Sequence, residues 1–359
     1  MSIPSYILAI ETSCDETAAA VVAGCGDVLS NVVASQVKDH AAFGGVVPEI
    51  ASRRHIELIG PVVREALHQA GISPRDLGGI AVTQGPGLIG ALLVGISYAK
   101  ALAYGLNLPV CGINHLEGHL AAARIDASLS YPHVGMVVSG GHTSLYEVTD
   151  ETTITQIGQT IDDAAGEAFD KVAKLLNLGY PGGAIIEKIS RGVDHSAVEL
   201  PRPMMNDDTF DFSFSGLKTA VLHLVQRSDI FEGLDLKFSG LPEAKKPRPG
   251  REHLVPVIAA AFQAAVVDVL VAKAVRAVQE YGMDLLVVSG GVASNTALRE
   301  ALRERAAQEH IRLVIPQRKY CTDNAAMVGV ASIRHFRDGQ HAGLDMNAVS
   351  RWSSITGLH

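Results

Sequence analysis

Asn114-His115-Leu116-Glu117-Gly118-His119-Leu120-Ala121-Ala122-Ala123 lies between two halves of the sequence that repeat the same order of predicted elements. A short predicted strand at 109–113 leads into this stretch, which is predicted to form a helix. His115 and His119 are four residues apart, so their side chains point from the same face of the helix. Such a pair can bind one divalent metal ion. Helix histidines also cap, pack or face solvent, and the spacing alone leaves both interpretations open.

The acid in this stretch is Glu117, two residues after the first histidine. At 3.6 residues per turn it lies about 200° around the helix from His115. A zinc-peptidase helix instead has its glutamate directly after the first histidine, where it acts as general base. The stretch therefore predicts a metal clamp without a built-in base.

The alternation of strands and helices on both sides of this stretch favours an α/β architecture. Before it, strands are predicted at 7–11, 18–23, 27–35 and 79–83, with helices at 48–70 and 88–106. After it, strands are predicted at 134–139, 143–148, 285–289 and 312–315, with helices at 162–176, 255–281 and from 322 onward. The same order of elements in both halves predicts a duplicated domain.

Composition excludes several classes of protein. The 359 residues are 47% hydrophobic and 19% charged, which is unlike a disordered or fibrous chain. A net charge of −8 argues against binding of nucleic acid by bulk electrostatics, so RNA would need a local basic patch or a partner. The four cysteines form no C-x-x-C pair, which suits a reducing cytoplasm. No signal peptide is expected, and the apolar run 88–106 is predicted to be a buried helix.

Three glycine turns each follow a predicted buried strand: Gly85-Pro86-Gly87, Gly140-Gly141 and Gly290-Gly291. Glycine lets the backbone approach a ligand closely, and free N–H groups at such turns bind phosphate. Each turn taken alone is explained by ordinary strand-to-helix turn chemistry. Three at equivalent strand ends favour a nucleotide or phosphate site.

Other polar residues near these turns have structural explanations of their own. Asp170, taken in isolation, is a solvated helix acid, and Asn295 is expected to cap the next helix. Asp323 lies at the start of the final helix, where acids favour the helix dipole. It becomes a candidate metal ligand because a two-histidine site needs a third, anionic ligand.

Residues 178–252 are predicted to be the least regular part of the chain, and a loop of this length is often functional. The segment contains the basic loop Lys245-Lys246-Pro247-Arg248-Pro249-Gly250-Arg251. Such a loop is more often a solvated surface segment than a contact with an anionic polymer. The sequence leaves open whether it binds RNA.

Five motifs together resemble the bacterial tRNA N6-adenosine threonylcarbamoyltransferase family (TsaD). They come in the family's order and cover nearly the whole chain. The motifs are Ile10-Glu11-Thr12-Ser13-Cys14-Asp15-Glu16-Thr17, Asn114-His115-Leu116-Glu117-Gly118-His119, Val138-Ser139-Gly140-Gly141-His142-Thr143, Phe212-Ser213-Phe214-Ser215-Gly216-Leu217-Lys218-Thr219 and Cys321-Thr322-Asp323-Asn324. Ala184 departs from the family's usual proline, and the loop 242–252 is extended.

The resemblance implies the fold of the actin, hexokinase and Hsp70 ATPases (ASKHA), two duplicated α/β domains around a central cleft. Residues 1–130 would form the first domain, joined by the C-terminal helix and tail at about 325–359. Residues 131–324 would form the second, with an irregular insertion at about 178–252.

The resemblance also implies the site and its reaction. The metal ligands would be His115, His119 and Asp323, holding one divalent metal per subunit, Fe2+ with Zn2+ as the alternative. The substrate contacts would be Val137, Val138, Ser139, Gly140, Gly141, Asp170, Gly183 and Asn295. The enzyme would transfer the threonylcarbamoyl group of threonylcarbamoyl-AMP to N6 of adenosine 37 in tRNAs that read codons beginning with A, giving t6A and AMP. Its partners would be tRNA, a shorter homologous subunit (TsaB) and a small ATPase (TsaE), in the cytoplasm and without a membrane.

Three other functions remain as alternatives. A metalloendopeptidase needs a water-activating acid near the metal, and Glu117 is predicted to face away. A phosphotransferase of the same fold would transfer the γ-phosphate of ATP to a small acceptor. A non-catalytic nucleotide-binding scaffold, like the family's shorter homologue, would lack the histidine pair that is present here. No residue is identified as the general base.

Overall fold

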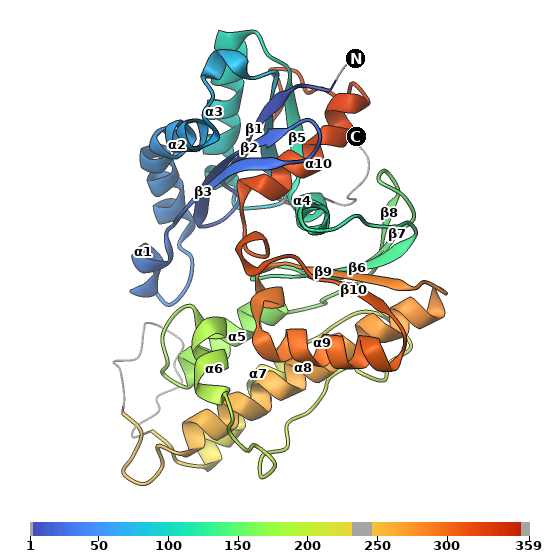
Figure 1. The fold of residues 1–359 in the computed structure, drawn as a ribbon. Coiled ribbons are helices and arrows are strands. Elements are labelled where there is room, and N and C mark those ends of the chain that lie inside the picture. Colours follow the sequence, from blue (N-terminus) through green and yellow to red (C-terminus); the bar gives the residue numbers. More distant parts are fainter. Residues whose placement is uncertain (1–2, 232–245, 353–359) are drawn as a thin grey trace.

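The computed structural model describes residues 3–231 and 246–352, and it contains two five-stranded mixed sheets (Figure 1). The first sheet has the order β3-β2-β1-β4-β5, and the second has the order β10-β9-β6-β7-β8. The strands of the first are β1 (Tyr6–Glu11), β2 (Glu16–Ala23), β3 (Val28–Ser35), β4 (Gly79–Gly85) and β5 (Val110–Asn114). Those of the second are β6 (His133–Val138), β7 (Thr143–Val148), β8 (Ile154–Gln159), β9 (Leu285–Ser289) and β10 (Arg312–Val314).

The two sheets have the same topology. In the first, β1 pairs antiparallel with β2 and parallel with β4, and β3 and β5 extend the two sides. In the second, β6 pairs antiparallel with β7 and parallel with β9, and β8 and β10 extend the two sides. The predicted α/β class and the predicted duplication are therefore both confirmed.

Helices cover the sheets on both faces. The first half contains α1 (Val37–Ala41), α2 (Pro48–Ala70), α3 (Ile89–Leu106) and α4 (His115–Ala121), followed by the short 3-10 helix η2 (Ala122–Ile125). The second contains α5 (Ala165–Leu175), α6 (Gly182–Ser190), α7 (Ser215–Arg227), α8 (Leu254–Glu280), α9 (Thr296–Gln308) and α10 (Ala325–Arg337). The last of these, α10, crosses back and packs on the first sheet and on α4.

The alternation of side chains along β1 explains why this sheet needs cover on both faces. Ile7 and Ala9 pack in a core with α10, whereas Leu8 and Ile10 pack in a second core with α2 and α3. A strand that is buried on both faces is apolar throughout, as β1 is up to its last residue. The charged exception is Glu11, at the end where the strand leaves the sheet.

The helix with the two histidines, α4, lies between the two sheets (Figure 1). Its Leu116 and Leu120 pack on Val137 and Tyr146 of the second sheet. Its last turn and η2 pack against α10 on the first sheet. The junction between the two halves is thus the element that bears two of the three predicted metal ligands, His115 and His119.

The region 178–252 is more regular than the sequence predicted, because it contains α6 and α7. The start of α7 is stabilised by Asp162, whose carboxylate accepts hydrogen bonds from the backbone N–H groups of Phe214 and Ser215. That acid lies 52 residues before Phe214, so a local reading of the sequence does not find it. Strand β8 was also missed, because its burial does not alternate regularly.

Two helices are long and apolar enough to span a membrane by composition, α3 and α8. Most of the apolar window of α8 is buried in the core of the second half, as expected for a core helix. All four cysteines are free, as the sequence predicts. Of the basic loop, Lys245 lies outside the described residues. We propose that the two sheets mark two domains, with a boundary at residues 130–131 and α10 belonging to the first.

The packing of α10 on the first sheet is tested at Gly329. A Cβ there would lie 2.5 Å from Val22 Cγ2 and 3.2 Å from Ala9 Cβ, so Gly329→Ala overpacks the contact. We expect a free energy of unfolding lower by about 1–3 kcal/mol, measured by denaturant titration. The control is Gly105→Ala in α3, where a Cβ meets nothing within 4 Å. It should raise the free energy of unfolding by about 0.5–1 kcal/mol. Equal stability of both variants would contradict this packing.

Candidate functional site

The helix α4 positions both histidines on one face. The helix starts at His115, and the side-chain oxygen of Asn114 caps it by accepting from the backbone N–H groups of Leu116 and Glu117, at 2.8 and 3.3 Å. The rings of His115 and His119 have centroids 4.7 Å apart and planes at 80°. Both residues are buried, so the two rings lie in a space largely closed to solvent.

Asp323 joins the histidines from the segment before α10. Its Oδ1 lies 3.1 Å from His119 Nε2 and 3.6 Å from His115 Nε2. Asn324 caps α10 by accepting from the backbone N–H of Met327, which fixes where the preceding aspartate lies. The structure therefore brings together the three predicted ligands, and their candidate ligand atoms all lie within 4.8 Å of one another.

The donor set fits a divalent metal ion. Both ring nitrogens of His119 are buried and have no hydrogen-bond partner, since the 3.1 Å contact with Asp323 lacks hydrogen-bond geometry. Such an orphaned imidazole has a lone pair available for a ligand. Ligands about 2.0–2.2 Å from one ion in tetrahedral geometry lie roughly 3.4 Å apart, close to the contacts of Asp323. Two imidazoles and one carboxylate leave positions open for a substrate.

The electrostatics of this cluster favour positive charge. Burial lowers the pKa of His115, but the carboxylates of Asp323 and Glu11 outweigh burial and raise it to about 9. Burial raises the pKa of Asp323, but His115 and His119 lower it well below its ordinary value. Burial also lowers the pKa of His119, which therefore stays neutral, the form that binds metals.

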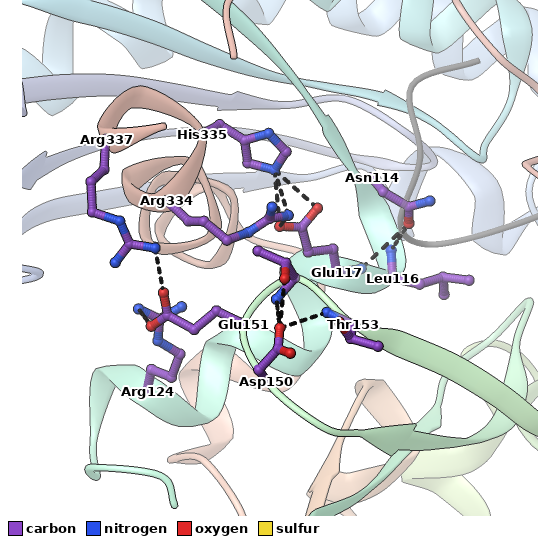
Figure 2. A network of polar contacts seen from close by, with 11 residues as sticks. Asn114, Leu116, Glu117, Arg124, Asp150, Glu151, Thr153, Arg334, His335 and Arg337 are labelled. Atoms are coloured by element: carbon purple, nitrogen blue, oxygen red, sulfur yellow. Dashed lines mark hydrogen bonds and ion pairs between the residues drawn. The ribbon is translucent and has the colours of Figure 1, made fainter. Parts of the chain in front are cut away.

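Glu117 points toward Arg334 and His335 of α10 (Figure 2) and is not part of the cluster of His115, His119 and Asp323, as its position on the helix predicted. Its Oε1 lies 2.7 Å from Arg334 Nη2 and 3.0 Å from His335 Nε2, both on α10. Burial raises the pKa of Glu117, but the contacts with His335 and Arg334 lower it below its ordinary value. The carboxylate is thus ionised and fully engaged in joining α4 to α10.

A second ion-pair group in Figure 2 links both halves of the molecule. Glu151, in the connection between β7 and β8, lies 2.8 Å from Arg337 of α10 and 3.0 Å from Arg124 of η2. One carboxylate in the β7–β8 connection of the second sheet therefore contacts both α10 and η2. These pairs are partly exposed, so each contributes little to stability alone.

The three glycine turns differ in what surrounds them. Gly85 has a φ of 154°, and a Cβ there would overlap the carbonyl oxygen of Val349, which packs over this turn. Gly290 has a φ of 95°, and a Cβ would lie 2.3 Å from the carbonyl oxygen of Val138. At Gly140 and Gly141 a Cβ would meet nothing within 4 Å. The open space of a ligand-binding turn is therefore found at the second turn.

The predicted substrate-binding residues fall into groups around this open turn. Val137 and Val138 end β6, and Ser139 to Gly141 form the turn itself. The start of α5 lies against the turn, because a Cβ on Gly166 would come within 2.6 Å of the Ser139 carbonyl oxygen. One helical turn further along α5, Asp170 Oδ1 accepts a 2.7 Å hydrogen bond from the Gly182 N–H, next to Gly183.

Asp170 is not the solvated acid that it appeared to be in isolation. Burial raises its pKa to about 6, and the nearby negative charge of Asp15 adds to the rise. The cause is the packing of α6, whose start is held against α5 by close contact of Gly182 with Phe169 and Ala173. A half-buried carboxylate at a contact between helices is a stronger candidate for ligand binding than a surface acid.

Asn295 caps α9, as the sequence predicted. Its Oδ1 accepts from the Leu298 N–H at 3.1 Å, and its Nδ2 donates to Gln263 Oε1 at 2.8 Å. Both ends of the buried amide are therefore engaged within the protein. Any contact with a substrate would use the second lone pair of Oδ1 or the second proton of Nδ2.

Two residues near the site were missed by sequence reasoning. His142 follows the open turn, and its ring centroid lies 6.3 Å from that of His115, so it joins the turn to the histidine cluster. Burial, His115 and His119 lower its pKa to about 4, which keeps it neutral. The other is Glu11, which contacts His115 directly at 3.2 Å. Its signal in the sequence was a charged residue that ends an apolar strand.

Comparison with known proteins connects this site to a family. The family model described as tRNA N6-adenosine threonylcarbamoyltransferase matches residues 27–330. A protein of that name from Geobacter sulfurreducens is 50% identical over 346 residues, 96% of each chain. One from Syntrophus aciditrophicus is 50% identical over 347 residues, 96% of this chain and 97% of the relative.

Solved structures agree with the fold. Full-length HypF, in a phosphate- and nucleotide-bound form, aligns with a TM-score of 0.59 at 14% identity, over 93% of this chain and 47% of HypF. The likeness concerns the fold alone, which is the actin, hexokinase and Hsp70 type predicted above. The sequence matches show that the chain belongs to the tRNA N6-adenosine threonylcarbamoyltransferase family.

Proposed function

We propose that this chain transfers the threonylcarbamoyl group of threonylcarbamoyl-AMP to N6 of adenosine 37 in tRNAs that read codons beginning with A. The family is one of acyltransferases, and this reaction gives t6A and AMP. The observation that carries the proposal is the buried cluster of His115, His119 and Asp323 next to an open glycine turn. The two features bring a cation site and an anion site together.

His115, His119 and Asp323 would hold one divalent metal ion, Fe2+ with Zn2+ as the alternative. Two imidazoles and a carboxylate suit both metals. When bound, such an ion supplies Lewis acidity that polarises the carbonyl of the carbamoyl group, an effect of several kcal/mol. Glu117 is committed to Arg334 and His335, which supports the transferase over a metallopeptidase.

The open turn would bind the adenylate. The amides of Gly140 and Gly141 make no hydrogen bond within the described part of the chain, so they are free to donate to a phosphate oxygen. The turn also begins at the end of β6 and faces the start of α5, where the helix dipole favours negative charge.

Asp170 and Gly183 would position the nucleoside, and Asn295 would complete that site from α9. In the reaction, the N6 amine attacks the carbamoyl carbon, a C–N bond forms, the bond between that carbon and the AMP oxygen breaks, and the amine nitrogen releases one proton as AMP leaves. AMP is a good leaving group, so no protein nucleophile is needed. The residues of the chain thus contribute mainly by holding the two reactants in line.

The proposed partners are tRNA, which the family's name implies, a shorter homologous subunit (TsaB) and a small ATPase (TsaE). The proposed location is the cytoplasm, which agrees with four free cysteines and with the burial of α8. The net charge of −8 supports a role for partners or a local basic patch in tRNA binding.

The metal ligands are tested by His119→Ala and Asp323→Asn. We expect each to lose bound metal and to lower transfer of labelled threonylcarbamoyl to tRNA by at least about 100-fold, because Lewis-acid help of several kcal/mol is removed. Metal analysis of anaerobically purified protein and the reconstituted tRNA assay are the measurements. His68→Ala, which changes an exposed histidine of α2, is the matched control. Full labelling by His119→Ala would rule the metal role out.

The role of Asp170 predicts opposite effects on stability and on binding. Its pKa is raised from 3.8 to about 6, so the folded state binds this proton more tightly than the unfolded state does. The contribution of the protonated Asp170 carboxyl to the free energy of unfolding is fully present below pH 3.8 and is lost as the pH rises through about 6. At pH 7 the free energy of unfolding of Asp170→Asn should therefore be about 1–3 kcal/mol higher than that of wild type. Its KM for threonylcarbamoyl-AMP should rise at the same pH.

The control for this experiment is Asp208→Asn, which removes an exposed acid. It should leave the KM unchanged. It should also leave unchanged the free energy of unfolding between pH 4 and pH 7, the range set by the pKa shift of Asp170. A gain of stability in Asp170→Asn without any change in KM would remove Asp170 from the substrate site.

The basic loop is tested by Lys245→Glu with Lys246→Glu. If the loop contacts tRNA, binding should weaken, and the slope of log Kd against log salt should become shallower by about one to two units, because two phosphate contacts are lost. Filter binding over a salt series is the measurement. An unchanged affinity and slope would assign the loop to the solvated surface.

A further inference from the structure

Glu11 is a charged side chain that is fully buried at the end of β1. Glutamate is almost never fully buried unless it is paired. Its neighbours along the strand belong to the two apolar cores of the first sheet, so packing gives no reason for an acid here. The reason must lie in the partners of the carboxylate.

Both oxygens of Glu11 accept hydrogen bonds. Oε1 accepts from the backbone N–H of Ser13, and Oε2 accepts from Thr83 Oγ1 at 2.6 Å. Oε2 also lies 3.2 Å from His115 Nδ1. Two fixed donors, from the β1–β2 turn and from β4, therefore aim the carboxylate at one nitrogen of His115.

The other ring nitrogen of His115 faces the opposite way, because Nε2 is the atom that lies 3.6 Å from Asp323. A neutral imidazole carries one proton, and the hydrogen bond at one nitrogen decides which nitrogen keeps it. With an acceptor at Nδ1, the proton stays there and the Nε2 lone pair points into the cluster.

We propose that Glu11 is a positioning residue, which accepts the Nδ1–H of His115 and so presents Nε2 of that ring to a cation. The inference rests on the proposed role of His115 as a metal ligand. Thr83 and the backbone of Ser13 hold Glu11 in place. Ser13 Oγ also lies 3.2 Å from the same Nδ1, but it carries no charge.

A carboxylate is required at this position for a geometric reason. The Ser13 N–H and the Thr83 hydroxyl both donate to Glu11, one to each oxygen. A glutamine would place its NH2 group against one of these donors or against Nδ1–H, whichever way the amide turned. Glu11→Gln therefore keeps the shape of the side chain but disturbs the aim of the His115 ring.

His119 shows the contrast. Neither of its ring nitrogens has a hydrogen-bond partner among the described residues, so no side chain there selects its tautomer. The two histidines of the cluster are thus unequal: His115 has a fixed orientation, and His119 is free to adjust. Loss of Glu11 should leave the orientation of the His115 ring as free as that of the His119 ring.

The test uses the full-length chain and Zn2+ as the probe. Zn2+ affinity is measured for the metal-free protein by competition with a chromophoric chelator, and Glu11→Gln should bind about 10–100-fold more weakly than wild type. In Zn2+-loaded protein with 15N-labelled histidine, wild type should show a slowly exchanging Nδ1–H proton for His115, which Glu11→Gln should lose. Neither readout depends on catalysis.

The matched control is Glu117→Gln, the same substitution at a buried carboxylate of α4 that contacts Arg334 and His335 of α10 instead of the rings of His115 and His119. It should lower the melting temperature but keep the Nδ1–H signal and most of the Zn2+ affinity. If Glu117→Gln weakens Zn2+ binding as much as Glu11→Gln does, the effect is a general loss of packing and the proposal is wrong.

Thr83 provides a second route if Glu11→Gln does not fold. Thr83→Val removes one donor to Glu11 and should weaken Zn2+ binding, whereas Thr83→Ser keeps the hydroxyl and should restore it. Wild-type affinity in both Glu11→Gln and Thr83→Val would overturn the positioning role while leaving the metal site intact. Failure of wild type to bind one Zn2+ per chain would overturn the metal site, and the positioning role with it.

Discussion

The docking of the last helix onto α4 depends on one buried polar contact, between Glu117 of α4 and Arg334 with His335 of α10. The partners are 217 and 218 residues apart in the chain, and the side chains of Glu117 and Arg334 are each only 7% exposed. Breaking such a pair leaves an uncompensated buried charge, which costs about 3–5 kcal/mol. Two histidines come from α4 and the aspartate from the segment just before α10. The contact thus joins α4 to α10 beside the three candidate ligands.

The two halves of the duplicated fold carry different functional groups at corresponding positions. By the shared topology, the β6–β7 turn corresponds to the β1–β2 turn. The β6–β7 turn contains Gly140 and Gly141 and is open, whereas the β1–β2 turn directly follows the buried Glu11. The first half instead contributes buried polar groups, Glu11 among them. In the proposed reaction, one copy of the turn would bind the anionic adenylate and the other would support the cation site, with α4 between the two sheets.

Sequence reasoning succeeded where the signal was local. The helix at 48–70 and the strand at 285–289 follow from periodicity and turn residues, and the structure has both. The direction of Glu117 followed from helix geometry, although its partners did not. Reasoning failed where distant residues decide the outcome: Asp162 starts α7 from 52 residues away, and α6 buries Asp170. Asp323 could be suggested as a ligand from the chemistry of the site, but only the fold brings it to the histidines.

The return of α10 to the first sheet has a consequence for synthesis on the ribosome. One apolar face of that sheet, with Ile7 and Ala9, is covered by residues 325–337, which are translated after almost all the rest. The second half has its own core and can mature while the chain is still growing. The N-terminal half must wait with an uncovered hydrophobic surface, so a nascent chain that stalls late exposes its first-made part to chaperones and to aggregation.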